Sequence, residues 1–125
     1  MLLDADVLID LLRAHPPALT WISSLTTLPA VSGFAAMELL YGCRDTRERK
    51  KVEKFLSVFE ILWPNEEAMK RALFDYAPLK LSHNLSAFDA MIAATAVGQG
   101  MELGTFNVKH FKHVPGLSVV KPYVR

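Results

Sequence analysis

The 125-residue sequence predicts one α/β domain, residues 1–125, in which a mainly parallel sheet carries helices on both faces. Strand-like apolar segments alternate with helix-like segments, without repeats or an internal linker, and this alternation is typical of parallel sheets joined by helical crossovers. Hydrophobic residues make up 51% of the chain, which is enough to build a core.

The first strand is expected at residues 1–3, which are apolar and are followed directly by Asp4. Apolar residues at helical spacing predict a helix over 7–14, with Asp6 as its candidate N-cap. Ligands of open α/β sheets bind outside the carboxyl ends of the strands, so Asp4 stands where chemistry is expected.

The next elements are a second helix, a strand and a third helix. Two prolines at 16–17 open a helix over 18–28, because proline is tolerated in a first turn. Residues 29–32 predict a short strand whose last residue, Ser32, caps a helix through Tyr41, and Gly42 ends that helix.

The middle of the chain predicts a helix, a strand and a further helix. Asp45 and Glu48 have the spacing of a capping box and open an amphipathic helix. Its inward-facing residues are expected to be Val52, Phe55, Leu56 and Phe59. Residues 60–63 predict a strand, and Asn65 caps a helix that runs to about residue 77.

The last third predicts a loop, a helix and two strands. The loop is expected at 78–85, the helix at 86–98, and the strands at 101–105 and 117–120. The long helix is apolar nearly all round, with Asp89 close to its start.

Three carboxylates, Asp4, Glu38 and Asp89, each lie at a strand end or in an apolar helix. An ionised carboxylate buried without a partner costs several kcal/mol, so these residues need a cation, a hydrogen-bond network or an opening to water. Ordinary explanations remain open for each residue. Asp89 can form a capping box with Ser86, Glu38 can pair with an arginine or tyrosine, and Asp4 can simply end a strand.

In a doubly wound sheet the three acids are expected to converge on one edge, which would require a cation. Two carboxylates about 4 Å apart repel by roughly 4 kcal/mol at an effective dielectric constant of about 20. Oxygen ligands favour Mg²⁺ or Mn²⁺. Such an ion favours hydrolysis of a phosphodiester, because it stabilises charge on the phosphate.

Four segments, taken in order, resemble the motifs of PIN-domain proteins, specifically the VapC toxins of toxin–antitoxin pairs. They are Leu-Leu-Asp-Ala-Asp around Asp4, Ala-Met-Glu-Leu-Leu-Tyr-Gly around Glu38, Phe-Asp-Ala-Met-Ile-Ala-Ala-Thr-Ala around Asp89, and Thr-Phe-Asn-Val-Lys-His-Phe around Asn107. The resemblance implies a three-layer α/β/α sandwich and a Mg²⁺- or Mn²⁺-dependent endoribonuclease. It also implies a homodimer and inhibition by a VapB-like antitoxin, with DNA contacted only through that antitoxin.

By motif position the catalytic residues would be Asp4, Glu38, Asp89 and Asn107, and the first three would hold the metal. The sequence departs from the family pattern in two of its polar positions. Asn107 stands where relatives often have aspartate and contributes no charge, and Asp6 stands where many have asparagine, serine or threonine.

Basic residues are candidates for RNA contacts. The helix after Asp45 carries a local excess of three positive charges, which fits the solvated face of an amphipathic helix. The residues nearer Asn107 are the better candidates for phosphate contacts, and they are Lys109, His110, Lys112 and His113.

Other classes of protein fit less well. The Asp4-Ala5-Asp6 segment also resembles the nucleophile motif of haloacid-dehalogenase-type phosphatases, but neither the later Asp-Asp pair nor a cap domain is visible. A receiver domain would need a mid-chain phosphoacceptor aspartate, and residues 55–65 offer only Glu60. A PIN-like binding scaffold without activity remains an alternative, since Asn107 lacks charge.

Composition favours a soluble, cytoplasmic protein. No apolar run approaches the roughly 18 to 20 residues of a membrane span, and the first residues are acidic where a signal peptide would be basic. Cys43 is the single cysteine and cannot form an internal disulfide, which agrees with a reducing compartment. A net charge of +1 excludes a strongly basic protein, so nucleic-acid contacts must come from a local patch.

Overall fold

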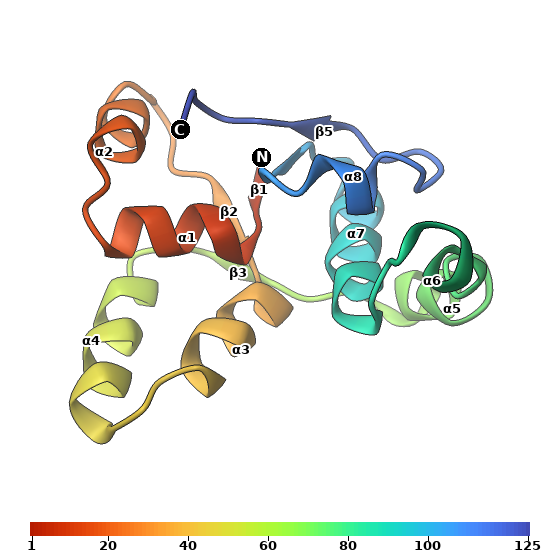
Figure 1. Cartoon of the computed structure of the whole chain (residues 1–125), viewed down its shortest axis with the longest axis horizontal. Coiled ribbons are helices and arrows are strands. Elements are labelled where there is room, and N and C mark those ends of the chain that lie inside the picture. Colours follow the sequence, from red (N-terminus) through yellow and green to blue (C-terminus); the bar gives the residue numbers. More distant parts are fainter.

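The computed structural model describes all 125 residues and confirms a parallel sheet of five strands in the order β3-β2-β1-β4-β5. The strands are β1 (Leu2–Leu3), β2 (Ala30–Ser32), β3 (Ile61–Leu62), β4 (Leu103–Gly104) and β5 (Val119–Val120). The helices are α1 (Ala5–Leu12), α2 (Pro16–Ser23), α3 (Gly33–Tyr41), α4 (Thr46–Leu56), α5 (Glu66–Phe74), α6 (Pro78–His83), α7 (Ala87–Gln99) and α8 (Val108–Phe111). Figure 1 shows α1 to α4 on one side of the strands and α5 to α8 on the other, which is the expected three-layer arrangement.

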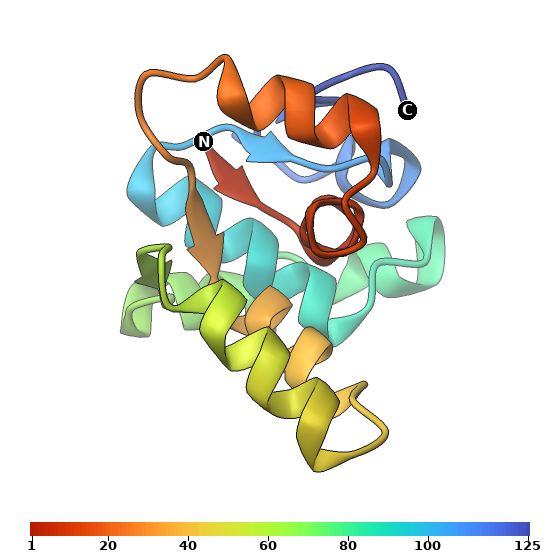
Figure 2. The same ribbon diagram turned by 90° about the vertical axis from the view of Figure 1, so that its left-hand side faces the viewer.

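The central strand β1 determines where the site forms. Leu3 pairs with Val31 of β2 on one side and with Gly104 of β4 on the other. The chain leaves β1 toward β2, whereas β4 continues to β5 on the opposite side, so the strand order reverses between β1 and β4. Open α/β sheets bind ligands at such a reversal, beyond the carboxyl ends of the strands. The turned view shows α1 nearly end-on where it leaves β1 (Figure 2).

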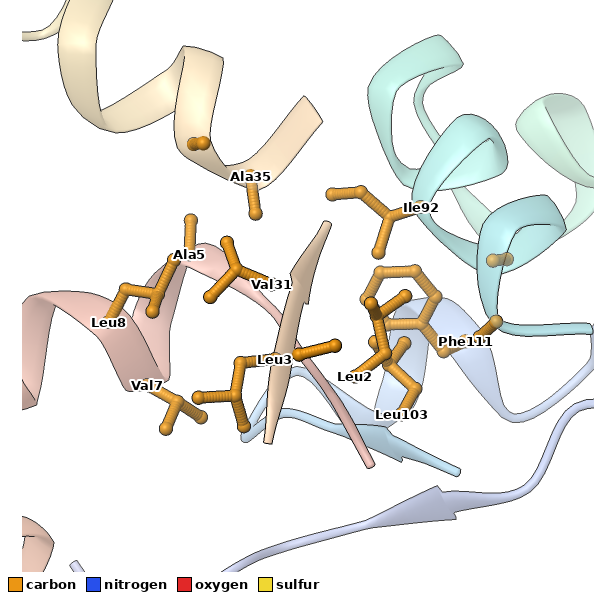
Figure 3. Close-up of a cluster of buried hydrophobic side chains, with 14 of the residues drawn as sticks. Leu2, Leu3, Ala5, Val7, Leu8, Val31, Ala35, Ile92, Leu103 and Phe111 are labelled. Atoms are coloured by element: carbon orange, nitrogen blue, oxygen red, sulfur yellow. The ribbon is translucent and has the colours of Figure 1, made fainter. Parts of the chain in front are cut away.

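The core lies on both faces of β1. Leu2 and Leu3 are fully buried, and successive side chains of a strand point to opposite faces. Leu2 lies with Ile92 and Phe111, and Leu3 lies with Val7 of α1 (Figure 3). Burial of each leucine stabilises the fold by about 1.5–3 kcal/mol, so the acidic residue after β1 is attached to a firmly packed strand.

Helix capping follows local sequence in most places. Asp45, Asn65 and Ser86 cap α4, α5 and α7 as expected, each accepting a hydrogen bond from a backbone N–H three residues later. The capping box of α7 is complete, because Asp89 also accepts from the backbone N–H of Ser86. In α4 the box is shifted, since Glu48 accepts from the backbone N–H of Arg44 instead of Asp45.

Two capping predictions are wrong. The first helix begins at Ala5, so its N-cap is Asp4 and not Asp6, which lies inside the first turn. Ser32 occupies the N-cap position of α3, but its hydroxyl is buried and makes no capping hydrogen bond.

The segment expected to be a loop at 78–85 contains α6, and this prediction is wrong. Pro78 opens the helix, where its missing N–H costs nothing, and Asn84 ends it in the left-handed conformation with φ 58°. The short α8 was not expected, and α2 ends at Ser23 rather than continuing to residue 28. No helix is both long and apolar enough to cross a membrane.

Candidate active site

The predicted acids meet at the carboxyl end of the sheet. Asp4, Asp6, Glu38, Asp89 and Asn107 line one cleft of about 450 Å³. The walls of this cleft are completed by Ala5, Ile9, Phe106 and Arg125. The structure therefore brings together all four residues expected from the motifs, and it adds Asp6 and Arg125.

Asp4 is the most buried of these acids, with 7% of its surface exposed. Its Oδ1 accepts a hydrogen bond from the backbone N–H of Ala5 at 2.7 Å, and its Oδ2 accepts from the Thr105 hydroxyl at 2.8 Å. Burial, followed by the neighbouring charge of Asp6, raises the pKa of Asp4 to about 7. Its two hydrogen bonds are therefore insufficient to offset the loss of hydration, and the site holds excess negative charge.

Thr105, which the sequence places at a strand end and at the start of the fourth motif, contacts Asp4 directly. It is fully buried, and its hydroxyl accepts a hydrogen bond from the backbone N–H of Asn107 at 3.0 Å while donating to Asp4. Its position directly after β4, level with Asp4 after β1, was the available signal. Thr105 thus sets the orientation of one carboxylate oxygen and of the loop that carries Asn107.

Asp6 ties α1 to the segment after β4. Its Oδ2 accepts from the backbone N–H of Phe106 at 2.8 Å, and its Oδ1 accepts from the N–H of Val7 at 2.8 Å. The extra carboxylate thereby has a structural role as well as a place in the cleft wall.

Glu38 is exposed, although the sequence places it in an apolar helix and therefore leads us to expect a buried acid. The apolar residues of α3 do not all turn inward, because Tyr41 is 84% exposed. Partial burial in the cleft, followed by the charges of Asp89 and Asp6, raises the pKa of Glu38. Glu38 therefore faces the other acids across solvent.

Asp89 combines its capping role with a place in the cleft. Its Oδ2 lies 3.4 Å from the backbone nitrogen of Ser86 and 3.3 Å from Nδ1 of His110. The same His110 nitrogen lies 2.7 Å from the amide Nδ2 of Asn107. His110 therefore connects the third and fourth motif residues, a contact that sequence spacing did not indicate.

The other predicted basic contacts lie outside the cleft. Lys109, Lys112 and His113 are exposed, and none of them lines it. The cation in the cleft wall is Arg125, whose guanidinium lies 4.7 Å from the centre of the Phe106 ring and pairs with Asp10 at 3.0 Å. Sequence reasoning missed Arg125, since nothing local marks it.

The donor set fits a hard divalent cation. All of its candidate ligands offer oxygen. The raised pKa values of Asp4 and Glu38 indicate that ionised carboxylates are unfavourable in the cleft, and a bound cation would stabilise them. No three His, Cys, Asp or Glu side chains lie close enough to form a complete ligand set. Mg²⁺ typically binds one or two carboxylates and keeps several waters, so it does not need a complete set of protein ligands.

Comparisons with known proteins agree over nearly the whole chain. A PIN domain family model matches residues 1–117. Ribonuclease VapC10 of Mycobacterium tuberculosis is 37% identical over 125 residues, covering 98% of this chain and 91% of that protein. A toxin–antitoxin complex from Klebsiella pneumoniae superimposes with a TM-score of 0.76 at 30% identity, covering 98% of this chain and 97% of that one. VapBC2 of Rickettsia felis, solved with a DNA fragment from its promoter, gives a TM-score of 0.77 at 23% identity over 95% and 96% of the two chains, which shows likeness of fold alone.

Proposed function

The chain belongs to the PIN-domain family, as its four motifs predict, and we therefore propose that it is a metal-dependent endoribonuclease acting as the toxin of a toxin–antitoxin pair. The observation that carries the proposal is the cleft in which Asp4, Glu38, Asp89 and Asn107 meet. The name of the Mycobacterium tuberculosis relative supports RNA as the substrate. Membership in this family sets aside the phosphatase and receiver-domain alternatives.

Asp4 and Asp89 are the proposed ligands of Mg²⁺ or Mn²⁺, with Glu38 adjusting the ion or a second one. The ion, when bound, neutralises charge on the phosphodiester and acidifies water. The Thr105 hydroxyl donates a hydrogen bond to one Asp4 oxygen, which fixes the orientation of this carboxylate in the cleft. Glu38, with its raised pKa and exposed position, is suited to accept a proton from the attacking water.

Asn107 contributes an amide instead of a fourth charge. Its backbone N–H is held by Thr105 and its side chain contacts His110. We therefore assign Asn107 to orienting water or substrate. If the site proves inactive, this lost charge is the feature that favours a binding scaffold as the alternative function.

The test is cleavage of total cellular RNA by the purified protein with Mg²⁺, with Mn²⁺ and with EDTA. Cutting at few sites is expected only with metal. Asp89→Asn should lower the rate by about 100-fold or more, because the ion that would stabilise charge in the transition state loses a ligand. The matched control is Asp45→Asn, which changes an exposed acid at another helix N-terminus and preserves the cap. Cleavage that survives EDTA, or full activity of the Asp89 variant, would refute the proposal.

A VapB-like antitoxin is the proposed partner, and the Klebsiella pneumoniae complex supports it. We further propose that the protein is a cytoplasmic homodimer that contacts DNA only through the antitoxin. Copurification with the product of an adjacent small reading frame tests the pairing. A promoter fragment should shift in a gel with the complex and not with the toxin alone.

A further inference from the structure

A second hollow, of about 410 Å³, adjoins the acidic cleft. It is lined by Met37, Glu38, Tyr41, Gly42 and Phe88. Glu38 belongs to both hollows, so the second one begins where the acidic cleft ends. Apart from Glu38, its lining carries no charge.

The hollow results from two helices that also supply acids. Tyr41 lies three residues after Glu38 on α3, so the two side chains share one face of the helix. Phe88 directly precedes Asp89 in the first turn of α7. The spacing of the aromatic residues from the acids is therefore set by rigid elements.

The two aromatic rings are accessible to a ligand, and Phe88 is held in place. Tyr41 is 84% exposed and Phe88 39% exposed. The Phe88 ring meets Phe34 edge-on with 5.6 Å between centres, and Phe34 meets Trp63 in the same way at 5.6 Å. Edge-to-face contacts of this kind restrain a ring without covering both of its faces.

We propose that this hollow binds a nucleobase of single-stranded RNA next to the phosphate that occupies the acidic cleft. The proposal rests on the proposed function, since the phosphate must lie among the acids. The hollow has no cationic side chain to bind a phosphate, whereas an uncharged base can stack on Tyr41 or Phe88. Bases of single strands are free to stack on aromatic side chains, and bases inside a duplex are not.

The test uses a short synthetic RNA that contains a cleavage site found in total RNA, together with versions that carry one abasic nucleotide on either side of the scissile phosphate. For the wild type, kcat/KM should fall at one of these positions by roughly 5- to 150-fold, the usual effect of losing one stacked base. Tyr41→Ala should show a similar loss on the intact RNA and little further loss on the abasic one. Tyr41→Phe should retain the wild-type pattern, because it keeps the ring.

Two further variants separate stacking from general effects. Phe88→Ala should reproduce the Tyr41→Ala pattern. Phe74→Ala, which removes a 69% exposed aromatic ring from α5, should behave as the wild type. Fluorescence anisotropy with the labelled RNA, measured on the Asp89→Asn protein, should show the same base dependence in binding without cleavage.

The outcomes distinguish this inference from the proposed function. Wild-type protein that cleaves no RNA with either metal overturns both. If removing a base lowers kcat/KM by the same factor in the wild type and in Tyr41→Ala, the base site is wrong and the proposed function stands. If Tyr41→Ala changes the sedimentation coefficient and leaves the abasic penalty intact, the hollow is an interface between copies of the chain and the inference is wrong.

Discussion

Replacing Asp4 by asparagine is expected to abolish RNA cleavage and, at the same time, to stabilise the metal-free protein above neutral pH. Burial and the charge of Asp6 raise the pKa of Asp4 from 3.8 to about 7, so ionisation of this carboxyl costs the folded state about 4 kcal/mol. The carboxyl is protonated in both states below pH ~4. Stability is lost as the pH rises from about 4, where the unfolded chain ionises, to about 7, where the folded state does. Asparagine carries no such cost.

The asparagine side chain fits the same contacts. Its Oδ1 can accept from the backbone N–H of Ala5, and its amide can donate to Thr105. The Thr105 hydroxyl can then donate to Oδ2 of Asp6, which already lies 3.3 Å away. The variant therefore removes a charge and leaves no buried group without a partner, the case in which a substitution at a buried polar site need not destabilise.

The assay is urea denaturation in EDTA near pH 5 and near pH 8. Relative to Asp4→Asn, the wild type should lose about 2–3 kcal/mol of unfolding free energy between these conditions. Adding Mg²⁺ near pH 8 should stabilise the wild type and not the variant, because an ion bound only by the native state raises its stability. Equal pH dependence of the two proteins, or a variant that is less stable than the wild type near pH 8, would contradict this prediction. Asp45→Asn, at an exposed cap, is the control.

Three other substitutions test the packing around the site. Thr105→Val should lower the unfolding free energy by about 2 kcal/mol in urea denaturation, because Asp4 Oδ2 and the N–H of Asn107 lose their partner. Thr105→Ser keeps the hydroxyl and should retain most of the wild-type stability. Gly33→Ala should lower the melting temperature, since a Cβ there would lie 2.5 Å from the Trp63 ring and relieving such overpacking costs about 1–3 kcal/mol; an unchanged melting temperature would mean that the ring moves freely. Tyr123→Phe removes a 2.8 Å hydrogen bond to Asp10 and should cost about 1 kcal/mol near pH 7. Burial raises the pKa of Asp10, but hydrogen bonds from Arg125 and Tyr123 outweigh burial and lower it. The stability lost in Tyr123→Phe should therefore fade as the pH falls below about 4. A loss that does not depend on pH would contradict this assignment.

The convergence of the acids was predictable because it depends on topology more than on detailed packing. Asp4 follows a strand, Asp89 lies in the first turn of a helix, and parallel strands present their carboxyl ends at one edge. Helix caps were predictable for a similar reason, since Asp45 and Ser86 bond to a backbone group only three residues away. These capping contacts involve short stretches of chain and therefore do not depend on how the rest of the chain folds.

The fold class, the alternation of strands and helices and the acids at the sheet edge thus follow from the sequence alone. The hydrogen-bond partners of those acids, in contrast, depend on how distant elements pack. Thr105 reaches Asp4 across 101 residues and Arg125 reaches Asp10 across 115, and the exposure of Glu38 depends on how α3 lies beside the cleft. Periodicity and capping report on residues within about four positions, whereas a buried hydrogen bond between distant residues depends on how whole helices and strands pack.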